Sequence, residues 1–311
     1  MVYETFLQEI KSRMELALGE RYQLSLHKVP KNNGLVLDGL CISKDHSHIA
    51  PALYLNPLYE EYTGGRALED ITLELLSLYR ANETPPPLDY KKFTDFQAMK
   101  PRIACRLIHR TANEALLKEI PYIPWLDLAL VFYICLDENE NSLMTAAIHN
   151  THIKLWNISA KELYHLALDN TRRRFPPVIT SMARILEDLN LTGAITMGYD
   201  LYGPDTNLSS PFYVLTNIQG INGAVCLLYP QVLKNFAEEA GRDIIILPSS
   251  IHEVLLLPDN GDISCEEMSR LVTQINRSEV PGPDRLSNQV YYYSRNTDSI
   301  TIASHSTAPV C

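Results

Sequence analysis

A polar cluster late in the chain carries residue types that hydrolytic enzymes use. Ser249, Ser250, His252, Glu253 and Asp259 lie between and beside two apolar segments that we expect to be strands. The histidine could act as a general base beside either serine, with Asp259 or Glu253 orienting its ring. The same residues could instead form a polar connection between strands, with the hydroxyls bonded to the backbone. We favour the connection, because serine, histidine and acidic residues often meet by chance in loops.

Histidines also occur in pairs at two other places. His149 and His152 are three residues apart after a predicted strand, a spacing that could ligate a metal ion. No nearby acid or cysteine completes such a set, so we predict no metal there. His46 and His48 alternate beside Asp45, and we interpret this weak chelating pattern as a solvated loop.

Three consecutive arginines, Arg172, Arg173 and Arg174, follow a predicted helix and precede Phe175. The helix dipole stabilises cations near a helix C-terminus, so these arginines need no ligand. An anion or an acidic partner could still bind there through charge-assisted hydrogen bonds.

Three consecutive tyrosines, Tyr291, Tyr292 and Tyr293, fall on a predicted strand near the end of the chain. Side chains alternate between the two faces of a strand, so at least one ring must point away from the core. Tyrosine is enriched at protein interfaces, and we therefore predict that the exposed ring takes part in one.

Several common kinds of site are excluded by motif. The chain has 13 glycines, and they form neither of the phosphate-binding loop patterns nor a nucleophile elbow. The 6 cysteines are scattered singly, without the paired spacing of a zinc knuckle or a thioredoxin-like site. We predict no cofactor.

Composition and charge narrow the class of protein further. Of the 311 residues 46% are hydrophobic and 21% are charged, which is ordinary globular usage. The net charge of −10 argues against wide contact with nucleic acid and against docking on anionic membranes. The N-terminal segment reads as an amphipathic helix rather than a signal peptide, so we expect a soluble cytoplasmic protein.

The spacing of apolar residues predicts the helices and strands on which these polar residues lie. Residues 1–95 predict an N-terminal unit with a helix, a hairpin that turns at Asn33-Gly34, and a second long helix. Residues 96–190 and 205–311 each predict the order strand, helix, strand, strand, helix. Ala224 to Tyr229 is predicted as a strand, and Ser159 with Glu162 as a capping box that opens a helix.

The shared order of elements predicts an α+β protein with a possible internal duplication. Each later block would form a small mixed sheet with helices on one face. Residue identity between the blocks is low, so recurrence of short α+β units by chance is an equal alternative.

Several stretches spread along the chain resemble the bacterial family catalogued as domain of unknown function 5688. They are His27 to Gly34, Ile49 to Pro51 with Tyr54 to Pro57, Phe93 to Phe96, Ile123 to Ala129, Trp156 ahead of the Ser159 helix, Tyr213 to Asn217, Leu247 to Gly261 and Tyr291 to Tyr293. The resemblance implies a bacterial cytoplasmic protein. It implies no activity, cofactor or catalytic residue.

Two functions therefore remain open. The first is a non-enzymatic binding or adaptor protein in the cytosol that binds a protein partner or associates with itself. The second is a hydrolase-like enzyme that uses His252 with Ser249 or Ser250 and a neighbouring acid. We favour the first, because no recognisable catalytic set is present.

Overall fold

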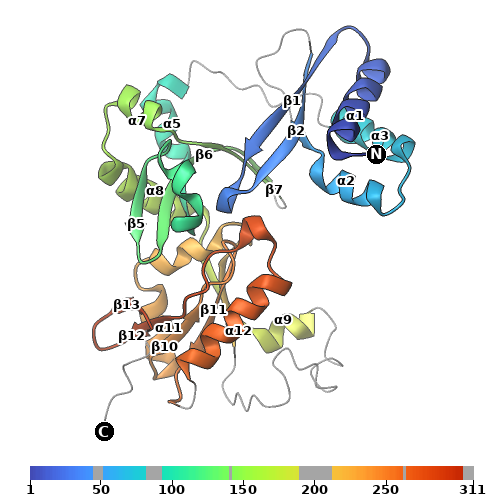
Figure 1. Ribbon diagram of the computed structural model, residues 1–311. Helices are drawn as coiled ribbons and strands as arrows, with labels where there is room; N and C mark the ends of the chain where they lie inside the picture. The colour runs from blue at the N-terminus through green and yellow to red at the C-terminus, as the bar shows by residue number, and fades with distance from the viewer. Residues whose placement is uncertain (45–51, 82–92, 140–141, 189–211, 262–263, 304–311) are drawn as a thin grey trace. The chain divides into compact units, whose positions relative to one another are not determined.

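The computed structural model describes residues 1–44, 52–81, 93–139, 142–188, 212–261 and 264–303 (Figure 1). The chain divides into two compact units, Met1–Asp89 and Tyr90–Cys311. In the described part of the chain no helix is both long and apolar enough to span a lipid bilayer. The blocks predicted at residues 96–190 and 205–311 both fall in the second unit.

The first unit is a three-stranded antiparallel sheet with helices packed on it. Asn33 and Gly34 turn the hairpin with φ of 60° and 69°, as the Asn-Gly pair predicts. Phe6, Ile10 and Ile71 from the helices join strand residues such as Leu40 in one buried cluster. The elements are α1 (Tyr3–Leu18), β1 (Tyr22–Pro30), β2 (Val36–Lys44), β3 (Ala52–Tyr54), α2 (Asn56–Thr63) and α3 (Leu68–Ala81).

The second unit begins with a four-stranded antiparallel sheet. The long strand β6 pairs with β4 along one edge and with β5 and then β7 along the other. The hairpin between β5 and β6 has a two-residue loop in which Leu126 adopts a φ of 52°. The elements are α5 (Phe96–Met99), β4 (Ile103–His109), α6 (Glu114–Leu117), β5 (Tyr122–Trp125), β6 (Leu128–Asn139), β7 (Ser142–Ala147), α7 (Asn150–Trp156) and α8 (Ala160–Arg174).

The predicted capping box at the start of α8 is confirmed. The Ser159 hydroxyl accepts from the backbone N–H of Glu162, and the Glu162 carboxylate accepts from the N–H of Ser159. Each side chain thus satisfies a backbone donor that the first turn of the helix leaves unpaired.

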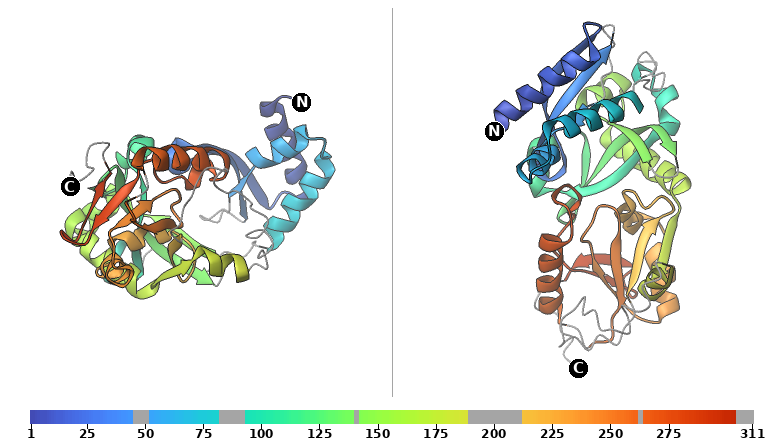
Figure 2. Two further views of the ribbon diagram at one scale, coloured as in Figure 1. Left: turned by 90° about the horizontal axis from the view of Figure 1, so that it is seen from below. Right: turned by 90° about the vertical axis from the view of Figure 1, so that its right-hand side faces the viewer.

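The rest of the second unit forms a six-stranded antiparallel sheet in the order β13-β12-β10-β11-β9-β8. Leu233 and Ala237 of α11 pack on one face of it, and Met268 and Val272 of α12 pack on the other (Figure 2). The elements are β8 (Pro177–Ser181), α9 (Met182–Asp188), β9 (Tyr213–Asn217), η4 (Gly223–Leu228), α11 (Val232–Ala240), β10 (Ile244–Leu247), β11 (Val254–Pro258), α12 (Cys265–Ser278), η5 (Gly282–Asp284), β12 (Tyr291–Ser294) and β13 (Ser299–Ile302).

Three details of the predicted α+β architecture are wrong. Every pairing among the described strands is antiparallel, so the sheets are not mixed. The six-stranded sheet carries helices on both faces rather than on one. The segment predicted as a strand at Ala224 to Tyr229 is the 3-10 helix η4, because an apolar run alone does not separate a buried strand from a buried helix.

The two sheets of the second unit share one hydrophobic core. Ile103, Leu107 and Phe132 of the first sheet belong to the same buried cluster as Ile246 and Leu256 of the second. The sheets differ in strand number and order, and their origin by duplication stays a hypothesis.

Candidate functional site

The candidate site lies on the connection between β10 and β11, which is hydrogen-bonded to a later segment. Backbone N–H groups of Leu286 and Ser287 donate to the carbonyls of Ser249 and Pro248, at 2.9 and 2.8 Å. The N–H of Ile251 donates to the carbonyl of Asp284 at 2.8 Å. These bonds fix the loop that carries His252 against the residues that follow α12.

Both ring nitrogens of His252 face a polar group. Nδ1 accepts from the backbone N–H of Asn222 at 3.2 Å, so the neutral ring carries its proton on Nε2. Nε2 lies 3.4 Å from Oδ1 of Asp284. About a third of each side chain is exposed, 31% for His252 and 33% for Asp284. The ring is thereby oriented, and its proton points at a carboxylate.

A pocket of about 390 Å³ opens beside this pair. Three carboxylates line it together with His252, namely Glu253, Glu279 and Asp284. Burial raises the pKa of Glu253, the charge of His252 and a hydrogen bond from Ser250 oppose that rise, and Asp284 adds to it. The remaining described lining residues are Gly220, Ile221, Ser250, Val280 and Pro281.

The structure brings only part of the predicted catalytic cluster together. Ser250 is 4% exposed, and its hydroxyl oxygen accepts from the backbone N–H of His252 at 3.0 Å. Asp259 lies at the opposite end of β11, where it accepts from the hydroxyl of Tyr292. His252 and Asp259 are seven positions apart, mostly along the extended strand β11, which sets them roughly 20 Å from each other. The carboxylate beside His252 is Asp284, which the sequence did not indicate.

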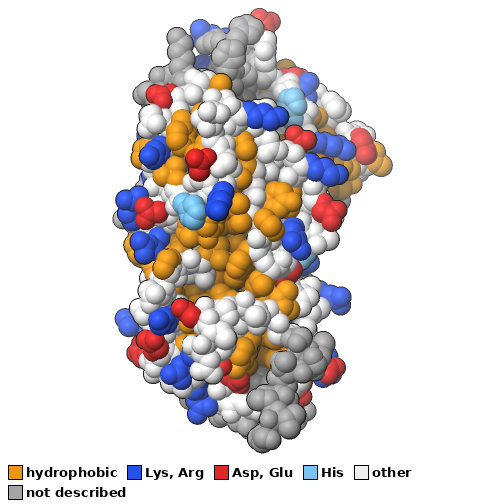
Figure 3. Space-filling model, turned by 90° about the vertical axis from the view of Figure 1, so that its left-hand side faces the viewer, with side chains coloured by type: hydrophobic (Ala, Val, Ile, Leu, Met, Phe, Trp, Pro, Cys, Tyr) orange, Lys and Arg blue, Asp and Glu red, His pale blue; other side chains and the backbone are white. Residues whose placement is uncertain are grey.

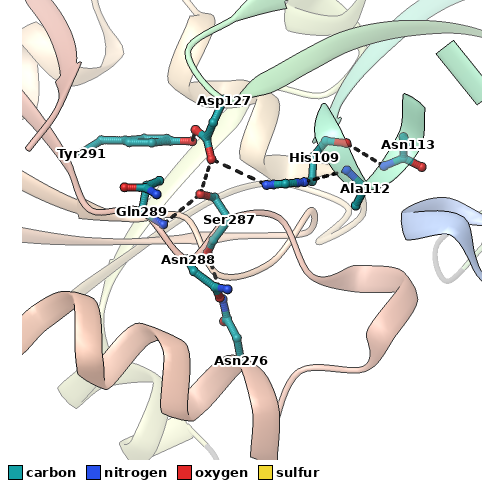
Figure 4. Close-up of polar contacts among 9 residues, drawn as sticks. All are labelled: His109, Ala112, Asn113, Asp127, Asn276, Ser287, Asn288, Gln289 and Tyr291. Carbon is teal, nitrogen blue, oxygen red and sulfur yellow. Dashed lines mark hydrogen bonds and ion pairs between the residues drawn. The ribbon is translucent and has the colours of Figure 1, made fainter. Parts of the chain in front are cut away.

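A second polar cluster centres on Asp127, in the strained turn between β5 and β6 (Figure 4). Its Oδ1 accepts from the Tyr291 hydroxyl at 2.5 Å, and its Oδ2 accepts from the Ser287 hydroxyl at 2.6 Å. Tyr291 is fully buried and Ser287 is 4% exposed. Burial and the Asp127 charge raise the pKa of Tyr291, so its hydroxyl remains a proton donor to the carboxylate.

His109 completes this second cluster from the end of β4. Its Nδ1 accepts from the N–H of Ala112 at 3.1 Å, and its Nε2 lies 3.8 Å from Oδ2 of Asp127 (Figure 4). The carboxylate therefore stands between the imidazole and the hydroxyls. In a catalytic triad the histidine contacts the serine hydroxyl directly and the carboxylate lies behind the histidine. Here the carboxylate of Asp127 contacts the hydroxyls, so the cluster is not a catalytic triad. The cluster instead joins the two sheets of the second unit.

Two of the three arginines at the end of α8 form ion pairs within the helix. Arg173 lies 2.9 Å and Arg172 3.7 Å from the Asp169 carboxylate, one helical turn earlier. Arg174 is the last residue of the helix. An anion or acidic partner at this surface stays a prediction.

The three tyrosines of β12 divide between the two faces of the sheet, as strand alternation predicts. Tyr291 and Tyr293 are buried, at 0% and 3% exposure, on the face that joins the large core. Tyr292 packs on the opposite face against the α12 cluster and donates to the carboxylates of Asp243 and Asp259. Helix α12 covers that face, and the sequence did not indicate this second covered face. An interface role for Tyr292 stays a prediction.

His149 and His152 lie at the start of α7. The N–H of His149 donates to Nδ1 of His152, whose ring stacks on Trp156. Burial, and to a lesser extent His149, lowers the pKa of His152. Over the described ranges no group of three or more histidine, cysteine or acidic side chains is arranged to hold a metal ion. Asp45, His46 and His48 lie outside the described residues.

Comparison with known proteins gives one match. The model of a family of unknown function, DUF5688, matches residues 3–295. No curated protein and no solved structure matches the chain significantly. The match spans both compact units and includes both polar clusters. The chain belongs to the DUF5688 family.

Proposed function

We propose that the protein is a binding protein whose His252 pocket takes a positively charged group of a partner, such as an arginine or lysine side chain. One observation carries this proposal: three carboxylates and one histidine line the pocket, and its described lining contains no lysine or arginine. A guanidinium or ammonium group would pair with Asp284 and Glu253 through charge-assisted hydrogen bonds.

The geometry favours binding over hydrolysis. A general base needs a free lone pair, whereas Nδ1 of His252 already accepts a backbone hydrogen bond and Nε2 carries the proton. The Ser250 hydroxyl is buried and bonds the backbone and Glu253. These contacts match the polar-connection interpretation of the sequence.

The surface supports a protein as the partner. On one face of the second unit, hydrophobic side chains gather among charged ones (Figure 3). Contiguous apolar surface of this kind is typical of sites where proteins bind each other. A protein partner could supply the basic side chain that the His252 pocket takes, and that side chain would give charge specificity.

The pocket can be tested with a matched pair of small ligands, N-acetylarginine amide and N-acetylcitrulline amide. They have nearly the same shape, but only the first carries a charge. We expect the arginine compound to bind at least about tenfold more tightly, because the citrulline compound lacks the charge-assisted hydrogen bonds. Asp284→Asn should weaken arginine binding by about tenfold. Calorimetry or an NMR titration would measure both differences.

The control variant is Glu239→Gln, which removes one charge from the exposed face of α11. It should leave binding unchanged if local contacts rather than net charge hold the ligand. Equal binding of the arginine and citrulline compounds would contradict the proposal, as would equal weakening by Asp284→Asn and Glu239→Gln.

The affinity should also depend on pH. Because burial raises the pKa of Glu253, this carboxyl stays protonated above its ordinary range near 4.3. A bound cation favours the ionised form, so affinity should increase as pH rises through the pKa of Glu253, and binding should release a proton. Glu253→Gln should therefore remove this pH dependence. An unchanged pH profile in that variant would contradict a role for Glu253.

A further inference from the structure

Arg106 occupies an unusual position for an arginine, in the middle of the buried strand β4. Its neighbours on the same face of that strand are Ala104 and Ile108, each 1% exposed. Val131 lies directly across on β6 and is 2% exposed. The side chain therefore leaves the strand among apolar neighbours.

Among the described residues no acceptor is found for the Nε–H of this cation. Nε of Arg106 is buried and has no hydrogen-bond partner. The ion pairs formed among the described residues do not include Arg106. Its guanidinium carbon lies 6.0 Å from the centroid of the Tyr133 ring. Burial lowers the pKa of Arg106, in keeping with a charge removed from water.

A second polar group beside Tyr133 also lacks a partner. Burial raises the pKa of the Tyr133 hydroxyl, and a hydrogen bond with the side chain of Asn222 opposes part of that rise. Asn222 is 4% exposed, and its Oδ1 is buried without a partner. The surroundings of Tyr133 thus hold an unused donor, Nε of Arg106, and an unused acceptor, Oδ1 of Asn222.

Buried charges in proteins are normally paired, since an isolated one costs several kcal/mol in lost hydration. We propose that Arg106, together with Tyr133 and Asn222, forms a binding site for a small oxyanion of the phosphate or carboxylate kind. The guanidinium would donate to two oxygens of the anion, and Asn222 Oδ1 would accept from a hydroxyl that the anion carries. Arg106 is half-buried as a whole residue, so part of its side chain is open to solvent.

The test compares the thermal stability of the whole chain and of Arg106→Met in buffers with and without anion. Inorganic phosphate and acetate are the two probes, and sodium chloride at equal ionic strength is the reference. A ligand at a hundred times its Kd should raise the Tm of the unaltered chain by roughly 5 °C or more. Arg106→Met should show no such rise. Because the methionine removes an unpaired charge, its Tm without anion should equal or exceed that of the unaltered chain.

Two further variants make the result specific. Arg106→Lys keeps the charge but loses the two-pronged donor geometry, so it should bind the anion about tenfold more weakly. Arg110→Met removes an exposed cation beyond the end of the same strand and should respond to anions as the unaltered chain does. A response to phosphate but not to acetate would identify the site as one for phosphate groups, and the reverse as one for carboxylates. Equal Tm shifts in the unaltered chain and Arg106→Met, or no shift in either, would overturn the proposal.

Discussion

Replacing Asp127 with alanine is expected to lower the free energy of unfolding of the second unit by about 3–5 kcal/mol. The substitution would leave the buried hydroxyls of Tyr291 and Ser287 without their acceptor. Each hydrogen bond to a charged group contributes about 1.5–3 kcal/mol, and an unsatisfied buried donor adds its own cost. Urea unfolding followed by circular dichroism would measure the change.

Asp127→Asn should cost less than Asp127→Ala, because the amide oxygen still accepts from one of the two hydroxyls. Asp298→Asn is the control, since Asp298 also accepts from a tyrosine hydroxyl, that of Tyr293, but at an exposed position. Its expected cost is below about 1 kcal/mol. If Asp127→Ala were no more damaging than Asp298→Asn, the cluster in Figure 4 would not be a structural link between the sheets.

Replacing Gly223 with alanine should destabilise the second unit by about 3 kcal/mol, because the added methyl group has no room. A Cβ at this position would lie 2.4 Å from the carbonyl oxygen of His252 and 2.9 Å from the backbone nitrogen of Asn217. It would also meet the Thr216 hydroxyl, which donates to the same carbonyl. Backbone atoms cannot move aside as a flexible side chain can, so the loop that carries His252 would shift.

Gly282→Ala is the matched control, because a Cβ there meets nothing within 4 Å. It should change stability by less than about 0.5 kcal/mol. The Gly223 variant should in addition weaken binding of the arginine compound, which the Gly282 variant should not. Equal stability of the two variants would show that the close approach of Gly223 to His252 is not maintained in solution.

Much of the fold was predictable from local sequence signals. The Asn33-Gly34 hairpin and the Ser159 capping box follow from backbone preferences that operate within a few residues. The strand β5 was missed because it is short and contains Pro124. The error at η4 arose because Ala224 to Leu227 are all buried, which leaves no alternation between polar and apolar residues to indicate the type of element.

The site was less predictable, because its parts come together through long-range packing. The sequence pointed to His252 and Ser250, which are near neighbours. The sequence could not indicate that His252 pairs with Asp284, because helix α12 lies between them in the chain. The two residues meet only because backbone hydrogen bonds of Ser249 and Ile251 hold the segment that follows α12 in place. Asp127 and Ser287 are 160 residues apart, so no local pattern could pair them. The only sequence signal for Asp127 was that it lies in the stretch Ile123 to Ala129, which resembles the family.

The protonation pattern of the His252 ring distinguishes a histidine that lines a binding pocket from one that serves as a base. Two-bond proton–nitrogen NMR correlations distinguish the two tautomers of a neutral imidazole. We predict the Nε2–H form, with ring signals that shift when N-acetylarginine amide is added and stay in place with the citrulline compound. A ring protonated on Nδ1, with its Nε2 lone pair free and no response to the arginine compound, would contradict the account.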